Sequence, residues 1–233
     1  MHPLTESIYR RLLREATEQQ RRGEKRLAQA EGLAAYSFRN NNNLIAVLYD
    51  PKYLIDNIDN ILNGGNVYVL HRVMQGIIEI SKTRDPCNGA WEIERSAIKN
   101  KGEGGLIYGL AFAMSPTGIL TPSRGSVSQR AQQGWIQQKG RNGKPFDHAG
   151  MPQNQDPSDD CRLHNDYDLC KGGHIDLDSH NRSYEEEGWE SALFSKLEEA
   201  HESTFDQLDS PAATTITNLF QQYVEGFFVK HLY

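Results

Sequence analysis

The sequence predicts an α/β protein in which helices flank a central mixed, largely antiparallel sheet, with an N-terminal helix and a C-terminal helical extension. Three observations support this fold class. Apolar residues recur with helical spacing at both ends of the chain, and short apolar runs of strand length lie between them. The last of the long strands continues into a glycine-rich turn and then into an apolar helix.

The length and composition predict one main domain. With 233 residues and 37% hydrophobic content, the chain can bury one substantial core. It has no apolar stretch near the roughly 18 residues of a membrane-spanning helix, and it is polar from Thr5 onward, so we expect neither a membrane partner nor a signal peptide. Three cysteines fit a reducing compartment, which predicts a cytoplasmic location.

The charge is distributed unevenly over four predicted segments. These are an N-terminal helix (1–40), a core (41–146), an irregular acidic connection (147–182) and a C-terminal helical extension (183–233). The first two segments carry net charges of +3 and +4, and the rest of the chain carries −13. This polarity argues against a protein that binds nucleic acid along its whole surface, although it leaves room for a local basic patch.

The first element is a helix whose apolar face is formed by Leu4, Ile8, Leu12 and Ala16. The stretch 17–26 is polar all round, so only the first half of this helix is expected to pack well. The asparagine-rich stretch 38–43 is expected to break the pattern. Residues 44–49 then predict a short buried strand.

Helical and strand signals alternate over the next part of the chain. Asp50 and Pro51 are an N-cap and first-turn pair that predicts a helix as far as Leu62, ended by residues 63–65. Residues 66–74 and 76–83 alternate like strands, and the turn 84–89 joins the second of them to a strand at 91–98 as an antiparallel hairpin.

The rest of the chain is predicted to be helical apart from one strand and the long connection. A helix over 106–114 is followed by a short strand at 118–124 and by a helix to Lys139 that begins with a Ser126–Gln129 capping box. Residues 140–182 show little periodicity. Ser183 with Glu186, and Ser210 with Pro211, then open two helices, the second of which has an apolar stripe of Ile216, Leu219, Phe220, Tyr223 and Phe227.

The glycine-rich turn "KNKGEGG" has two interpretations. Glycine tolerates positive φ, so the turn can be a sharp connection and nothing more. Alternatively, Gly102, Gly104 and Gly105 let the amides at the helix start bind an anion beside Lys99 and Lys101. Neither the P-loop nor the dinucleotide-binding fingerprint is present.

Residues 44–139 resemble the GNAT N-acetyltransferase superfamily, and in particular the GNAT-like proteins encoded by bacteriophages. In that superfamily an antiparallel meander ends in a strand, a loop of pattern Q/R-x-x-G-x-G/A and a helix. Lys99, Gly102 and Gly104 match the spacing of the loop, with Lys in the first position. The resemblance implies that Ile98–Gly105, including Glu103, binds the pyrophosphate of acetyl-CoA.

A second part of the resemblance lies downstream. The family's N-x-x-A pattern followed by an aromatic residue corresponds here to Ser128, Ala131 and Trp135. The aromatic position commonly holds a tyrosine that protonates the departing CoA thiolate, and tryptophan has no proton to give near neutral pH. Arg124 and Ser128 are candidates to grip the CoA phosphate or an anionic substrate, while capping alone also explains the serine.

Acetyl transfer also needs a base for the attacking amine. Glu92 and Glu94 alternate along the predicted strand 91–98 and therefore share one face, where they can line a cleft or simply form a solvated surface. Glu79 is a third option. Tyr108 can replace the missing acid, or it can be an ordinary core aromatic.

The acidic connection contains Cys161, His164, Cys170 and His174, whose spacing can close a tetrahedral zinc site. The intervening loop is short and no zinc-finger signature is reproduced, so we expect no bound metal. The aspartates nearby lack the order of a calcium-binding EF-hand loop.

Together these observations predict an acyl-CoA-dependent N-acetyltransferase with acetyl-CoA as co-substrate and an unidentified amine acceptor. One alternative is a catalytically inactive GNAT-fold protein of a phage, associated with the virion or with a host protein through its N-terminal or C-terminal helices. A less favoured alternative is a GNAT-fold enzyme that modifies a nucleic-acid base or nucleotide. The location expected for a phage-encoded protein is the host cytoplasm or the virion.

Overall fold

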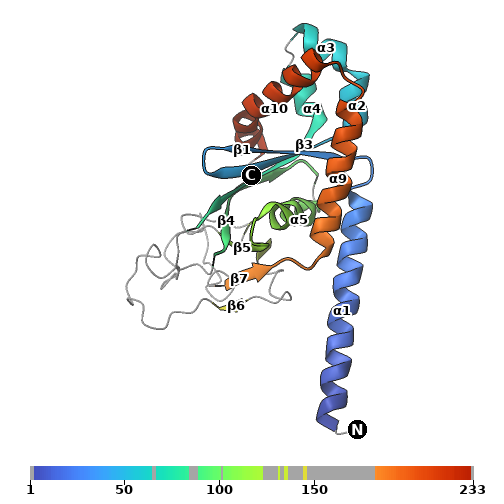
Figure 1. The fold of residues 1–233 in the computed structure, drawn as a ribbon, viewed down its shortest axis with the longest axis vertical. Coiled ribbons are helices and arrows are strands. Elements are labelled where there is room, and N and C mark those ends of the chain that lie inside the picture. The colour runs from blue at the N-terminus through green and yellow to red at the C-terminus, as the bar shows by residue number, and fades with distance from the viewer. Residues whose placement is uncertain are drawn as a thin grey trace, which may run out of the picture.

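The structure, a computed structural model, is a mixed α/β fold in which helices cover both faces of one sheet (Figure 1). It describes residues 3–64, 67–83, 89–100, 102–122, 131, 134–135, 144–145 and 182–231. The helices are α1 (Pro3–Gln29), α2 (Pro51–Asp56), α3 (Ile58–Gly64), α4 (Val67–Val73), α5 (Gly104–Met114), α9 (Trp189–Phe205) and α10 (Ser210–His231). The strands are β1 (Ala34–Asn40), β2 (Asn43–Tyr49), β3 (Met74–Lys82), β4 (Trp91–Ile98), β5 (Ile119–Pro122), β6 (Lys144–Pro145) and β7 (Arg182–Glu185).

The described strands follow the order β1-β2-β3-β4-β5-β7-β6. Every pair of neighbours is antiparallel except β4 and β5, which are parallel and are connected through α5. This arrangement confirms the predicted largely antiparallel mixed sheet. It also confirms the predicted antiparallel pairing of β3 with β4.

The helices form two layers, one on each face of the sheet. The α5 face is covered by α5 together with the first part of α9 and the end of α1, which share a core with apolar residues of β2, β3 and β4. The α10 face is covered by α10 and by α2 to α4, which form the second core with the opposite side chains of the same strands. Because β2 is buried on both faces, residues 44–49 form a continuous apolar run, whereas β3 is interrupted by Gln75, Glu79 and Ser81.

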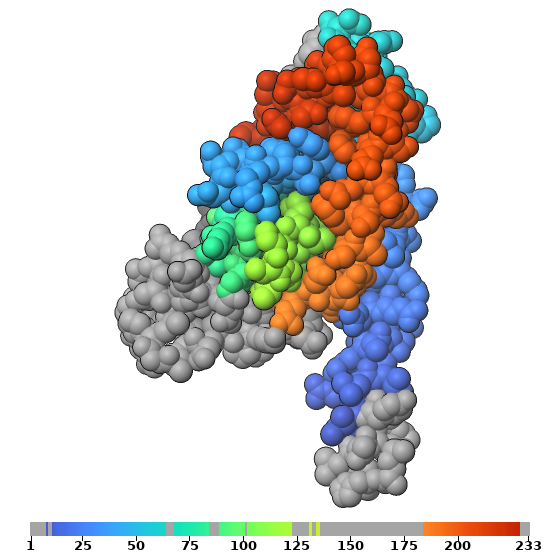
Figure 2. All heavy atoms as spheres, viewed as in Figure 1, coloured from blue at the N-terminus to red at the C-terminus, as the bar shows by residue number. Residues whose placement is uncertain are grey.

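Helix α1 confirms the predicted N-terminal helix and extends beyond the body it packs against (Figure 1). Its C-terminal part lies beside α9, whereas its N-terminal part projects from the molecule as an arm (Figures 1 and 2). The expectation that only the first half of this helix packs well is therefore wrong, because Leu12 stays exposed whereas Gly23 and Leu27 contact the body. We define the α1 arm as residues 3–18. Among the residues that the structure describes, no helix has the length and apolar character needed to cross a bilayer.

The break predicted at residues 38–43 is wrong, because these residues belong to a hairpin. Strands β1 and β2 pair from Ala34↔Tyr49 to Asn40↔Asn43, which leaves a two-residue turn. Asn41 adopts φ +54°, a left-handed conformation that asparagine tolerates better than most residues. The asparagine run therefore reverses the chain, and the sheet begins before residue 41.

The strand predicted at 66–74 is wrong for residues 67–73, which form helix α4. Leu70 and Val73, three positions apart, are both buried, whereas Tyr68 and Arg72, four positions apart, are exposed. This is the period of a helix. Because the segment is only seven residues long, its apolar pattern in the sequence fits both a strand and a helix.

The helix predicted to start at a Ser183–Glu186 capping box begins later. Residues 182–185 form β7, and α9 starts at Trp189 after Gly188, which has φ +86°. Glu190 in its first turn accepts a hydrogen bond from the amide of Glu187, which precedes the helix, at 2.8 Å. At α10, the predicted start and apolar stripe are confirmed, and Asp209 caps the helix through the amide of Ala212.

Two further predictions lie largely outside the described residues. Of the helix predicted from Ser126 to Lys139, only residues 131 and 134–135 are described, and they are helical. Of residues 140–182, which show little periodicity, only β6 and the first residue of β7 are described. The helix predicted after Asp50 is confirmed but is interrupted at Asn57, between α2 and α3.

Candidate functional site

The glycine-rich turn connects β4 to α5 through residues 99–103. The amide of Glu103 donates to the carbonyl of Asn100 at 3.3 Å, which closes the turn. Gly102 has φ +96°, where a residue with a side chain is strained. Lys101 lies outside the described residues.

The start of α5 is open at Gly104. Glu103 stands at the cap position, but its carboxylate makes no hydrogen bond to the helix and instead accepts from Asn100 Nδ2 at 3.1 and 3.3 Å. A Cβ built on Gly104 would meet no heavy atom of the described residues within 4 Å. An anion can therefore approach the first amides of α5, and the dipole of α5 favours its charge.

Arg26, from the last turn of α1, lies over the first turn of α5. A Cβ built on Gly105 would be 2.1 Å from Arg26 Nη2, so the guanidinium occupies the space that a side chain at position 105 would need. Arg26 Nη1 also donates to Gln29 at 2.6 Å. A guanidinium at the positive end of a helix is electrostatically unfavourable by itself and becomes favourable when an anion is shared between them.

Lys99 does not direct its charge at these amides. Its ammonium donates to the carbonyl of His71 at the end of α4 and lies 5.9 Å from the ring centroid of Phe227 in α10. The neighbouring residue Ile98 packs against the core of the α5 face. The ammonium that was predicted to bind the anion is therefore held on the α10 side.

The predicted carboxylates lie on the α10 face of the sheet. Trp91 and Ile93 point into the core of the α5 face, which places Glu92 and Glu94 on the other side. A bulge follows, because Glu79 pairs with Arg95 and Ile80 with Ile93, so Glu94 has no direct partner on β3. The exposed Glu94 accepts a hydrogen bond from Ser81 Oγ at 2.5 Å.

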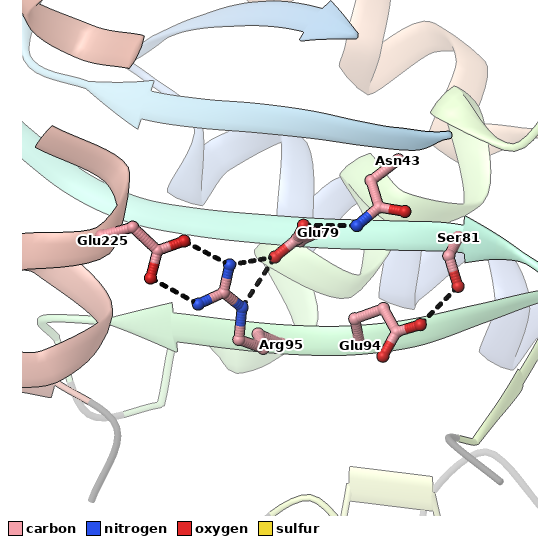
Figure 3. A network of polar contacts seen from close by, with 6 residues as sticks. All are labelled: Asn43, Glu79, Ser81, Glu94, Arg95 and Glu225. Atoms are coloured by element: carbon pink, nitrogen blue, oxygen red, sulfur yellow. Dashed lines mark hydrogen bonds and ion pairs between the residues drawn. The ribbon is translucent and has the colours of Figure 1, made fainter. Parts of the chain in front are cut away.

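Glu79 belongs to a polar network on the same face (Figure 3). It is only 4% exposed, and its carboxylate accepts hydrogen bonds from Asn43 Nδ2 at 2.6 Å and from Arg95 Nε at 2.7 Å. Arg95 also binds Glu225 of α10 through both terminal nitrogens, at 2.7 and 2.8 Å. Hydrogen bonding to Glu225 is the main cause that raises the pKa of Arg95, and the same contact lowers the pKa of Glu225. Arg95 therefore fastens the end of α10 to the sheet.

Tyr108 is a core residue of the α5 face. Its ring meets Trp135 edge-on with centroids 5.4 Å apart, and Trp135 in turn contacts Tyr184. Burial raises the pKa of Tyr108 to about 12, and a hydrogen bond to Ser96 opposes this shift. Trp135 is itself buried, at 1% exposed. These two aromatic residues pack the core and keep their protons near neutral pH.

Several predicted site residues lie outside the described residues. These are Lys101, Arg124, Ser128 and the four candidate zinc ligands Cys161, His164, Cys170 and His174. Within the described ranges, no group of three or more His, Cys, Asp and Glu side chains is placed to hold a metal ion.

Comparisons of the chain with protein-family models, with curated proteins and with solved structures find no match. The candidate site therefore rests on its own geometry. Of the residues that sequence reasoning missed, Arg26 is the most relevant to an anion site. Its only signal in the sequence is a position in the last turn of a helix, which does not reveal that the turn meets α5.

Proposed function

We propose that this protein is an acyl-CoA-dependent N-acetyltransferase of the GNAT type, with acetyl-CoA as its co-substrate. The observation that carries the proposal is the β4–turn–α5–β5 unit, in which an apolar helix starts at Gly104 and the space beside Gly104 is open among the described residues. A pyrophosphate bound there accepts hydrogen bonds from amides and is stabilised by the dipole of α5.

Arg26 adds a cation to this arrangement from a distant part of the chain. Its guanidinium lies against Gly105 and places a positive charge beside the start of α5. Glu103 has the opposite effect, because its carboxylate stands next to the same amides. The two side chains therefore give opposite and testable contributions to phosphate binding.

The reaction would join the acceptor amine to the acetyl group. The amine nitrogen attacks the thioester carbonyl carbon, a C–N bond forms, the C–S bond breaks, and sulfur leaves as the thiolate of CoA. A base removes the amine proton, and the thiolate takes a proton from water. Glu94 is the favoured base because it is exposed beside the bulge of β4, whereas Glu79 is buried and bound by Arg95 and Asn43.

The first experiment is a calorimetric titration with acetyl-CoA and CoA of the parent and of Gly104→Val. Open space around Gly104 lets the variant fold, and its side chain should block the pyrophosphate and abolish binding. The matched control is Gly226→Val in α10, which has comparable room and should bind as the parent does. In the parent, a hundredfold excess of ligand over Kd should raise the free energy of unfolding by about 2.7 kcal/mol.

Three more variants test the individual roles. Arg26→Met should weaken CoA binding, and Glu103→Gln should strengthen it by about 0.3–1 kcal/mol because a like charge leaves the helix start. Glu94→Gln should bind acetyl-CoA normally and lose turnover with an amine acceptor. A folded Gly104→Val variant that binds acetyl-CoA as tightly as the parent would overturn the proposal.

A second candidate function has its own supporting observation. Trp135 stands at the family's tyrosine position and is buried against Tyr108 and Tyr184, so it supplies no acid for the thiolate. This favours a protein that keeps the fold without catalysis and acts by contacting other proteins. Binding of acetyl-CoA with no transfer to any amine tested, or no binding at all, would favour this second function.

A further inference from the structure

A groove lies where the α1 arm meets the body of the molecule. Residues of α1 form one wall, and Glu187 and Trp189, just before and at the start of α9, form the other. Figure 1 shows the start of α9 beside α1. The groove has a volume of about 320 Å³, which is at the lower end of the roughly 300–1,000 Å³ of small-molecule pockets. Its size is that of a small organic molecule or of a single side chain.

The bottom of the groove is apolar. Gly23 lets the two walls meet, because a Cβ at this position would be only 2.8 Å from the Cβ of Trp189. Leu27, which packs against the core of the α5 face, lines one end, and the exposed Ala16 lines the other. Positions 16 and 27 of one helix are about 16 Å apart, at a rise of about 1.5 Å per residue. The groove therefore suits an extended hydrocarbon chain.

The polar residues of the lining present acceptors and keep their donors bonded within the protein. Gln19 Nε2 donates to the carbonyl of Glu187 at 2.5 Å, and Gln20 Nε2 donates to Glu24 Oε1 at 2.9 Å. The indole nitrogen of Trp189 donates to Glu187 Oε2 at 3.0 Å. Among the described residues, no donor is bonded to the side-chain oxygen of either glutamine. A ligand that brings hydrogen-bond donors is therefore favoured over one that brings acceptors.

The charge of the lining is negative by one unit. Glu187 is compensated, because its Oε1 lies 2.6 Å from Arg22 Nη2 and its side chain is only 9% exposed. Glu24 is exposed and forms no ion pair with a described residue. The described residues of the lining include no basic side chain. A single positive charge on the ligand would therefore complement the groove.

We propose that this groove binds an organic monocation, a primary ammonium group on a straight hydrocarbon chain. The hydrocarbon lies on the apolar bottom against Trp189 and Leu27. The ammonium donates to the carboxylate of Glu24 and to the amide oxygen of Gln20, one turn earlier in α1. None of the described residues that the proposed transferase uses lines this groove, so either proposal can fail without the other. A free alkylamine and a lysine side chain of another protein both carry this chemistry.

The first test is a calorimetric titration of the full chain with n-pentylammonium chloride, at constant ionic strength and without acetyl-CoA. The parent should bind one equivalent. Glu24→Gln should raise Kd at least threefold, the size of effect expected for one exposed charge pair. The matched control Glu18→Gln removes the same charge from an exposed position of α1 outside the groove and should bind as the parent does. A Glu24→Gln variant that binds as tightly as the parent would contradict the proposal.

The second test fills the groove from within. Ala16→Lys places a side chain and a positive charge in the lining at an exposed position, so the variant should fold and should no longer bind pentylammonium. Thr17→Lys adds the same charge at the next residue, outside this groove, and should leave Kd unchanged. Equal losses in the two variants would mean that the ligand responds to overall charge and has no site here.

The third test varies the ligand. Pentan-1-ol has the chain without the charge and methylammonium has the charge without the chain, so both should bind more weakly than pentylammonium. Pentan-1-ol that binds equally well would refute the selection of a cation. Nα-acetyl-lysine amide separates the two sources: tighter binding than pentylammonium assigns a lysine side chain, and weaker binding assigns a free amine. If neither compound binds the parent, the proposal is wrong.

Discussion

The two faces of the sheet are held by different kinds of contact. On the α5 face, small residues let large rings approach the backbone, as at Gly109, where a Cβ would lie 2.8 Å from the ring of Trp189. On the α10 face, polar and titratable side chains sit among aromatic residues, as in the bond from Tyr49 to His201 and the network around Arg95. Stability is therefore expected to depend on steric fit at the α5 face, and on protonation and charge at the α10 face.

The largest expected effect comes from filling the close contact on the α5 face. Gly109→Val should reduce the free energy of unfolding by about 3 kcal/mol, because a side chain there would meet the ring of Trp189 at 2.8 Å and Leu193 at 3.0 Å. Denaturant unfolding measures the change. Gly226→Ala, in the open part of α10, should instead be neutral or slightly stabilising, and a neutral Gly109→Val would show that the contact is soft.

The next effect tests the charge network on the α10 face. Arg95→Met leaves the buried carboxylate of Glu79 without its cation and should reduce the free energy of unfolding by about 2 kcal/mol. This is less than for a fully buried pair, because a third of the Arg95 side chain is exposed. The double variant Glu79→Gln/Arg95→Met should recover most of the loss, since no buried charge remains. If it recovers none, the contact of Arg95 with Phe228 matters more than its charge.

A pH effect is expected on the same face. Burial lowers the pKa of His201, which lies 2.9 Å from the Tyr49 hydroxyl and packs on Phe205. The unfolded chain, with a histidine pKa of about 6.5, then binds a proton more readily than the native state. Stability should therefore be constant above this pH and should fall as the pH drops below it toward the native pKa. His201→Gln should remove this part of the pH dependence. Thermal melting of the parent and of the variant, each above and below this pH, measures it. A loss of stability at the lower pH that is the same in both proteins would contradict the prediction.

The smallest effect is expected at an ion pair away from both cores. Lys196 Nζ lies 2.7 Å from Glu31 Oε2, and the two side chains are 41% and 80% exposed. Solvent screens such a pair, so Lys196→Gln should leave Tm unchanged in low and in high salt. A salt-dependent loss of Tm would mean that the α1–α9 contact depends on charge as much as the α10 face does.

The sequence was sufficient to predict an element wherever its hydrophobic pattern fits only one type of secondary structure. The strands at β2, β3, β4 and β5 are short apolar or alternating runs, and α10 has a long stripe with a clear helical period. It was insufficient at α4, because the apolar pattern of its seven residues fits both a strand and a helix. It was also insufficient at Asn41, because a hairpin turn and the end of regular structure have the same kind of polar sequence. Local patterns do not decide between such alternatives, and packing does.

The candidate site was predictable in its backbone and not in its side chains. The turn, its glycines and the start of α5 follow from local signals. The position of Arg26 depends on the packing of α1 against α5, and the direction of Lys99 depends on a carbonyl of α4. Both are contacts between distant parts of the chain, which spacing in a single sequence does not encode.

Trp189 also gives the molecule an optical signal. Its indole nitrogen donates to Glu187, and its ring lies between Gly23 of α1 and Gly109 of α5. Trp91 and Trp135, the other two tryptophans, are buried in the core, whereas Trp189 is only partly covered. Its fluorescence is therefore the one most open to a change in polarity. A shift in emission wavelength would report a displacement of α1 from the body before any unfolding of the sheet, without an attached dye.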